Sequence, residues 1–128
     1  MIQEIHYIPE PTDLQCGQAV LAMLTDIPVQ QVAEELQNDR ETTLREMKRY
    51  LRAHGLPPAD ERKQAQSKSD LPPLCLLSLE TPRCWHWSLF CDGVFYDPEH
   101  GVMRDFPVCA RKYFWEINPT DETEKETL

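Results

Sequence analysis

The chain has no long apolar segment, no leader pattern at its start and no closely spaced pair of cysteines. A bilayer span needs about 18 consecutive apolar residues, and a secretory signal needs a basic stretch before an apolar one, so neither is predicted. The five cysteines are odd in number and show no CxxC spacing, which favours reduced thiols over a disulfide framework. We therefore predict a cytoplasmic protein that does not enter a membrane, although leaderless secretion would leave no mark on the sequence.

Positive charge is also scarce. The chain has 13 Lys and Arg against 22 Asp and Glu, which gives a formal net charge of -9. Binding to phosphate backbones needs clustered Lys and Arg, so nucleic acid is not expected as a partner. The same charge disfavours docking on anionic membranes. The sequence implies no cofactor.

The apolar content supports one folded core. Hydrophobic residues make up 41% of the 128 residues, which is enough for a single domain without disulfides or metal. We expect this domain to occupy residues 1–119. Residues 120–128 are acidic and nearly devoid of apolar side chains, which predicts a disordered tail.

Helical periodicity fills the first half of the chain and strand patterns fill the second. Apolar residues recur at helical spacing over 16–26, 28–36 and 43–54, and Thr43 and Glu46 have capping-box spacing. After an extended or strand-like entry at 5–8 and a polar connection at 57–73, apolar runs predict strands at 74–79, 85–91, 94–96 and 112–117. Asp92-Gly93 predicts a two-residue hairpin turn. Helices followed by an antiparallel sheet are typical of the α+β class.

Cys16 is the most informative residue, because it stands where a Pro-rich turn passes into an amphipathic helix. Unpaired N–H groups give that end of a helix partial positive charge, which favours a nucleophilic thiolate. Gly17 has no side chain to block a substrate, and the Cys16 N–H is a candidate oxyanion-hole donor. The structural alternative is a buried cysteine that packs against the helix core.

His86 and Asp97 are the candidate partners of Cys16. His86 lies on one predicted hairpin strand and Asp97 at the end of the other, so pairing about Asp92-Gly93 brings the carboxylate near the imidazole. A carboxylate there fixes the histidine tautomer, as the third member of a catalytic triad does. The structural alternatives are a strand histidine without chemistry and a turn-forming Asp before Pro98.

The remaining histidines and the two tryptophans beside His86 give weaker evidence for a functional role. His54 is explained by a helix C-terminus, and His6 and His100 lie in connecting segments. His86, His100, Asp97 and Cys91 show no recurring metal-ligand spacing, so no metal site is predicted. Trp85 and Trp87 flank His86 on its strand; we expect them to pack in the core, with substrate binding as the alternative.

These features resemble the peptidase C39 family, papain-like cysteine peptidases that trim double-glycine leader peptides in bacteriocin exporters. The resemblance covers about residues 5–103 and is carried by the following positions: Ile5-His6-Tyr7-Ile8, Cys16-Gly17-x-Ala19, Met23-Leu24, the helix from Thr42 or Thr43 to Gly55, His86, Asp97-Pro98 and Gly101. It implies a bacterial protein with a papain-like fold and a peptide or protein substrate. It also implies that Cys16 is the nucleophile, His86 the base and Asp97 its orienting acid. The chain has no transporter segment, so a stand-alone relative is expected.

One position departs from the family. C39 peptidases usually carry a glutamine six residues before the cysteine, and here that position is Glu10. A carboxylate offers no donor to an oxyanion unless it is protonated, so Gln15 is a second candidate for that role. Three functions stay open: a cysteine peptidase or amidase, a catalytically silent module that binds a peptide or protein, and an acyltransferase or deamidase that uses the same thioester. Substitution of Cys16 separates the second from the others, and product analysis separates the first from the third.

Overall fold

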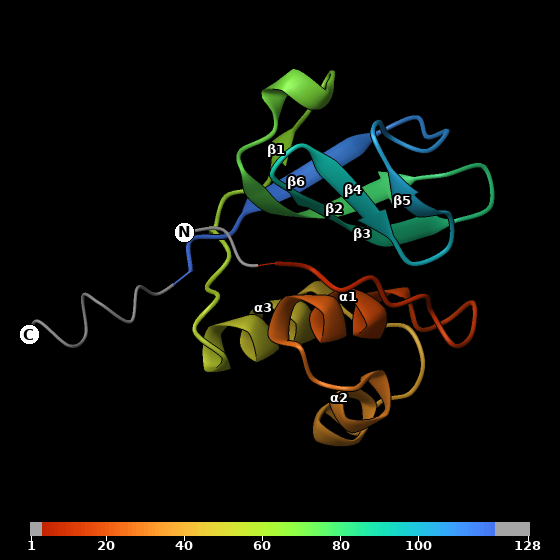
Figure 1. The fold of residues 1–128 in the computed structure, drawn as a ribbon, viewed down its shortest axis with the longest axis vertical. Coiled ribbons are helices and arrows are strands. Elements are labelled where there is room, and N and C mark those ends of the chain that lie inside the picture. Colours follow the sequence, from red (N-terminus) through yellow and green to blue (C-terminus); the bar gives the residue numbers. More distant parts are fainter. Residues whose placement is uncertain (1–3, 120–128) are drawn as a thin grey trace, which may run out of the picture.

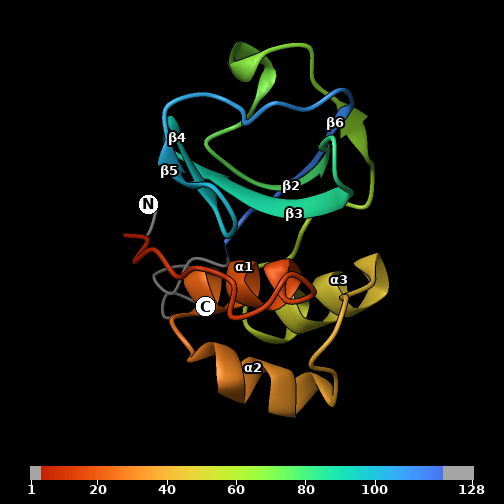
Figure 2. The same cartoon turned by 90° about the vertical axis from the view of Figure 1, so that its right-hand side faces the viewer.

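A layer of three helices lies against one face of an antiparallel sheet in the computed structural model, which describes residues 4–119 (Figures 1 and 2). The helices are α1 (Cys16–Thr25), α2 (Val29–Leu36) and α3 (Leu44–Ala53). The strands are β1 (Lys63–Gln64), β2 (Leu74–Glu80), β3 (Trp85–Cys91), β4 (Val94–Asp97), β5 (Gly101–Met103) and β6 (Lys112–Glu116). The predicted α+β class is confirmed, and the tail predicted at 120–128 lies outside the described residues.

Helix α1 is the buried element of the helical layer. It contacts β3 on one side and both other helices on the other, and in Figure 2 it lies between the sheet and α2. Its residues from Gly17 to Leu24 are all buried. The helix ends at Asp26, whose backbone adopts the left-handed conformation. The Ala- and Leu-rich sequence of α1 therefore reflects burial on several sides rather than a single apolar stripe.

The other helix boundaries follow from local chemistry. Thr43 and Glu46 form the predicted capping box at the start of α3, and Gly55 follows the helix with a φ of 75°, as a C-terminal glycine does. The predicted start of α2 at Pro28 is one residue early. Pro28 has extended backbone angles and caps the helix, because an N-cap residue is not itself helical.

The sheet has the order β1-β6-β2-β3-β4-β5 and every neighbouring pair is antiparallel. The predicted hairpin joins β3 to β4: Cys91 pairs with Val94, and Asp92 and Gly93 both have positive φ, as a tight two-residue turn requires. The sequence patterns did not predict β1 or β5, which have two and three residues. The entry at 5–8 is extended backbone and not a strand.

Two apolar clusters cover the two faces of the sheet. The first joins the sheet to the helices and includes Leu21, Leu24, Leu51, Leu76 and Leu89. The second lies on the other face, where loop residues cover Leu77, Phe90 and Phe95. Among the described residues, no helix is long and apolar enough to cross a membrane. The sheet is thus a fixed platform on which the start of β3 and the end of β4 meet the N-terminus of α1.

Candidate active site

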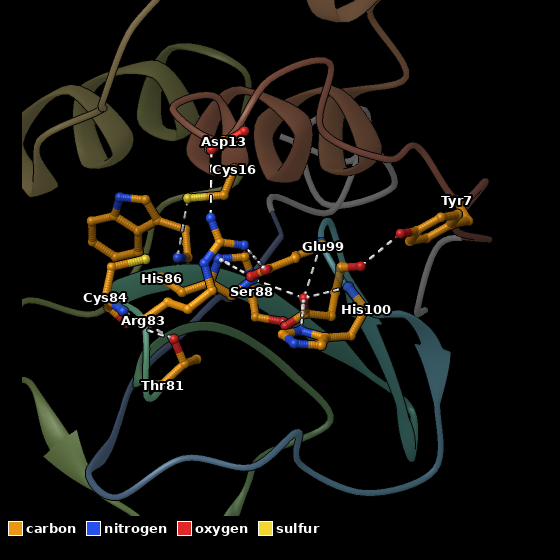
Figure 3. Close-up of polar contacts among 12 residues, drawn as sticks. Tyr7, Asp13, Cys16, Thr81, Arg83, Cys84, His86, Ser88, Glu99 and His100 are labelled. Atoms are coloured by element: carbon orange, nitrogen blue, oxygen red, sulfur yellow. Dashed lines mark hydrogen bonds and ion pairs between the residues drawn. The ribbon is translucent and has the colours of Figure 1, made fainter.

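Cys16 begins α1 directly above the start of β3 (Figure 3). The turn before it is closed by the Gln15 N–H, which donates to the carbonyl of Thr12 at 3.1 Å. The Cys16 side chain is half-buried, and its Sγ accepts a hydrogen bond from the backbone N–H of Trp87 at 3.4 Å. The sulfur thus lies at the N-terminus of α1 with one backbone donor directed at it.

His86 lies between Cys16 and Asp97. Its Nε2 is 2.7 Å from Oδ1 of Asp97, its Nδ1 is 3.9 Å from Oε1 of Glu99, and the ring is also within hydrogen-bonding reach of Cys16. The hairpin register explains the contact: Leu89 pairs with Tyr96, so Asp97 is opposite Ser88 and within reach of His86. The structure therefore brings together the three residues predicted as nucleophile, base and orienting acid.

Asp97 is fully buried and held on both of its oxygens. Ser88 Oγ donates to Oδ2 at 2.8 Å, and the backbone N–H groups of Glu99 and His100 each donate to Oδ1 at 3.0 Å. Burial alone would raise the pKa of Asp97, but the hydrogen bond and charge of His86 outweigh it and lower the pKa. Likewise, burial opposes a charged His86, whereas Asp97 and Cys16 raise its pKa. The charged form of His86 is thus stabilised mainly by its contact with the Asp97 carboxylate.

Glu10 lies at the same site, where the C39 family usually has a glutamine whose amide can donate to an oxyanion. Its backbone N–H donates to the carbonyl of Pro98 at 3.0 Å, which ties the entry segment to the turn after β4. Its Oε1 is buried and has no hydrogen-bond partner among the described residues. Burial raises the pKa of Glu10; the charge of His86 opposes this, and the charge of Glu99 adds to it.

Gln15 and Gly17, the neighbours of Cys16, both contact other parts of the protein. Gln15 is buried, and its amide donates to Oε1 of Gln18 at 2.7 Å. A Cβ atom at Gly17 would lie 2.7 Å from Oγ1 of Thr42 and 2.9 Å from a ring carbon of Trp87. Gly17 thus permits close packing of α1 against two neighbours, and its predicted role in admitting substrate has no contact to support it.

The two tryptophans beside His86 have different environments. Trp87 packs partly buried against the core, and its indole N–H donates to the carbonyl of Thr42 at 2.9 Å. Trp85 was predicted to pack in the core, which is wrong: it is 46% exposed and stacks on Tyr113 at 5.8 Å between ring centroids. The reason is position, because Trp85 is the first residue of β3 and lies at the rim of the sheet.

A cleft of about 420 Å³ opens beside the sulfur. It is lined by Asp13, Leu14, Cys16, Glu41, Thr42, Ser78, Arg83, Cys84, Trp85, His86 and Trp87. Arg83 reaches across the rim, with one guanidinium nitrogen 2.7 Å from Glu99 and another 3.5 Å from Asp13 (Figure 3). The sequence analysis did not predict contacts of Ser88, Glu99 or Arg83 at this site. For Ser88 a signal was available, because residues two apart on a strand point to the same face, as His86 and Ser88 do.

Within residues 4–119, two groups of side chains could hold a metal ion. One ligand atom from each of Glu10, Cys16 and His86 lies within 4.8 Å of the other two, and the same is true of His86, Asp97 and His100. In the second group Oδ1 of Asp97 already contacts both histidines at 2.7 and 2.9 Å. Ligands in the first group come from three separate segments, so no short spacing in the sequence could reveal them.

Comparison with known proteins gives a structural likeness without a sequence match. No family model and no curated protein sequence matches the chain. Its fold is similar to the crystal structure of a double glycine motif protease from an AMS/PCAT transporter in complex with the leader peptide. The TM-score is 0.60 at 18% sequence identity, and the match covers 93% of this chain and 94% of the other. The chain therefore has the fold of a peptidase of that kind.

Proposed function

We propose that this protein is a cysteine hydrolase that cleaves a peptide or amide bond, with Cys16 as nucleophile, His86 as base and Asp97 as orienting acid. One observation carries the proposal: His86 contacts the buried Asp97 through one ring nitrogen at 2.7 Å and is also within hydrogen-bonding reach of Cys16. The peptidase-like fold supports it. The cytoplasmic location expected from the sequence stays a prediction.

The chemistry follows from this arrangement. His86 takes the thiol proton, and the Cys16 sulfur attacks the substrate carbonyl carbon to give a tetrahedral oxyanion. The backbone N–H of Cys16 at the start of α1 is the available oxyanion donor. The C–N bond then breaks, His86 gives its proton to the leaving amine, and a thioester remains. Water, activated by His86, hydrolyses the thioester and restores the thiol.

The cleft suits a polypeptide better than a small apolar ligand, because charged side chains such as Asp13, Glu41 and Arg83 line it. The structural neighbour was solved with a leader peptide, which supports a peptide as the substrate class here. Asp13 and Glu41 at the rim and the overall charge of -9 favour a peptide that is neutral or basic. Sequence preference at the cleaved bond is left open.

A second function is favoured by Glu10. Its carboxyl lies beside the sulfur and the imidazole, and an ionised carboxylate opposes the negative charge that forms on the carbonyl oxygen. A papain-like module that binds a peptide without cleaving it would tolerate that charge. The two functions are distinguished by whether Cys16 turns over an acyl substrate.

Thiol reactivity tests the proposal without a known substrate. Iodoacetamide alkylation at pH 7 is followed by peptide mass mapping in the wild type and in His86→Ala, with the exposed Cys84 as an internal reference. We expect Cys16 to react at least tenfold faster than Cys84, and the advantage to be lost in the variant. In parallel, p-nitrophenyl acetate should give a burst and slow turnover that Cys16→Ala abolishes. Equal reactivity of the two thiols, with no burst, would leave the binding module as the function.

A further inference from the structure

The geometry points to a metal site that neither the sequence patterns nor the structural likeness assigns. We propose that Glu10, Cys16 and His86 together bind Zn²⁺ as a three-ligand site, and that the bound ion blocks the thiol. This inference goes beyond the proposed function and does not rest on it. Carboxylate oxygen, thiolate sulfur and imidazole nitrogen are the three donor types that zinc takes in proteins.

The distances suit a tetrahedral ion. The three ligand atoms lie within 4.8 Å of one another, whereas zinc bonds of about 2.0–2.3 Å place tetrahedral ligands about 3.3–3.8 Å apart. Side-chain rotation of Glu10 and Cys16, which are both only partly buried, would close a gap of about 1 Å. The three residues come from the entry segment, the start of α1 and the start of β3.

The unpartnered oxygen of Glu10 is a second, independent observation. Buried carboxylate oxygens in native proteins are hydrogen-bonded or bound to a cation, yet Oε1 of Glu10 has no partner among the described residues. Arg83, the arginine that lines the cleft, contacts Asp13 and Glu99 instead. A divalent ion between Glu10 and Cys16 would satisfy this oxygen and offset the excess of negative charge.

The surroundings of His86 match those of a metal-binding histidine. Such a histidine donates its second ring N–H to a carboxylate, which fixes the tautomer that ligates. Nε2 of His86 is 2.7 Å from the fully buried Asp97, so Nδ1 would face the ion with its lone pair. The same contact that orients a catalytic base therefore also orients a ligand.

The site has room for a fourth ligand. The cleft beside Cys16 has a volume of about 420 Å³ and is open to solvent, so water or the carboxylate of a bound peptide could complete the tetrahedron. Binding would release to solvent the protons that Cys16 and the Nδ1 atom of His86 carry, because both groups must be deprotonated to ligate. Because the sulfur is then a ligand, the metal-bound protein would neither alkylate at Cys16 nor turn over an ester.

The test uses the whole chain after removal of metal with a chelator. Zn²⁺ affinity is measured by competition with a chromophoric chelator. Co²⁺ is added separately to look for the near-ultraviolet charge-transfer band of a thiolate–metal bond. Glu10→Gln keeps the shape of the side chain and removes the anionic oxygen. Glu41→Gln is the matched control, because it removes one negative charge from the same cleft without touching a ligand.

We expect one Zn²⁺ per chain and a Co²⁺ band that Cys16→Ser abolishes. Affinity should fall at least tenfold in Glu10→Gln and by less than threefold in Glu41→Gln. Absence of the band from the wild type, or equal affinities of the two glutamine variants, would overturn the site. Failure of the proposed function looks different: the metal-free wild type would bind Zn²⁺ as expected but give no burst with p-nitrophenyl acetate.

Discussion

Replacing Glu10 with glutamine should make the protein a faster acyl-transfer catalyst at pH 8 with a chelator present. A ligand atom of Glu10 lies within 4.8 Å of the sulfur of Cys16. If the oxyanion, which forms next to this sulfur, is taken at a similar separation, the repulsion between two unit charges at an effective dielectric constant of about 20 is about 3.5 kcal/mol. This corresponds to between 10² and 10³ in rate, and partial exposure of Glu10 reduces it. We therefore expect an increase of about 10²-fold.

The assay is the burst rate with p-nitrophenyl acetate, which reports the first acyl transfer to Cys16. Glu41→Gln controls for the loss of one negative charge, because Glu41 lines the same cleft and is not one of the three clustered groups. An unchanged burst rate in Glu10→Gln, with Cys16 still acylated, would refute the argument that the Glu10 charge opposes the reaction. An equal increase of the burst rate in both glutamine variants would show that net charge, not position, sets the rate.

Three further perturbations test separate parts of the structure. Asp97→Asn should lower the burst rate by about 10²–10⁴-fold, because the amide can stabilise the wrong histidine tautomer, and should also lower the melting temperature, because the carboxylate is fully buried and hydrogen-bonded on both oxygens; a rate near wild type would remove Asp97 from the mechanism. Gly17→Ala should lower the free energy of unfolding in urea by about 1–3 kcal/mol, because its Cβ would lie 2.7 Å from Oγ1 of Thr42; an unchanged midpoint would contradict that packing. At pH 7.5 iodoacetamide should label Cys84 and spare Cys91, since burial raises the pKa of the Cys91 thiol to about 11, and labelling of Cys91 should grow as the pH approaches that value. Equal labelling at pH 7.5 would show that Cys91 is not buried as described.

Much of the framework was predictable because it is encoded locally. The capping box at Thr43 and the turn at Asp92-Gly93 are short-range patterns with defined backbone geometry, and both are present. The Asp92-Gly93 turn fixes the register of β3 and β4. That register places Oδ1 of Asp97 2.7 Å from Nε2 of His86. The juxtaposition of His86 and Asp97 therefore followed from one dipeptide.

Features that depend on contacts between distant segments were not predictable. Strand β1 has only two residues and exists through pairing with β6, so its own sequence carries no strand pattern. The exposure of Trp85 depends on where the sheet ends, which an aromatic residue in a strand does not reveal. Gly17 illustrates the same limit: the residues that require a glycine there, Thr42 and Trp87, are remote in the sequence.

The charge of Glu10 should have opposite effects on the two inferred properties of the site, thiol hydrolysis and Zn²⁺ binding. Its carboxylate opposes the oxyanion of a thiol hydrolase but supplies an anionic ligand to a metal ion. Glu10→Gln should therefore raise the acylation rate of Cys16 and weaken Zn²⁺ binding at the same time. Local unfolding would lower both quantities, and a residue without influence would change neither. Opposite changes from one substitution are thus the signature of a charge that acts at the sulfur.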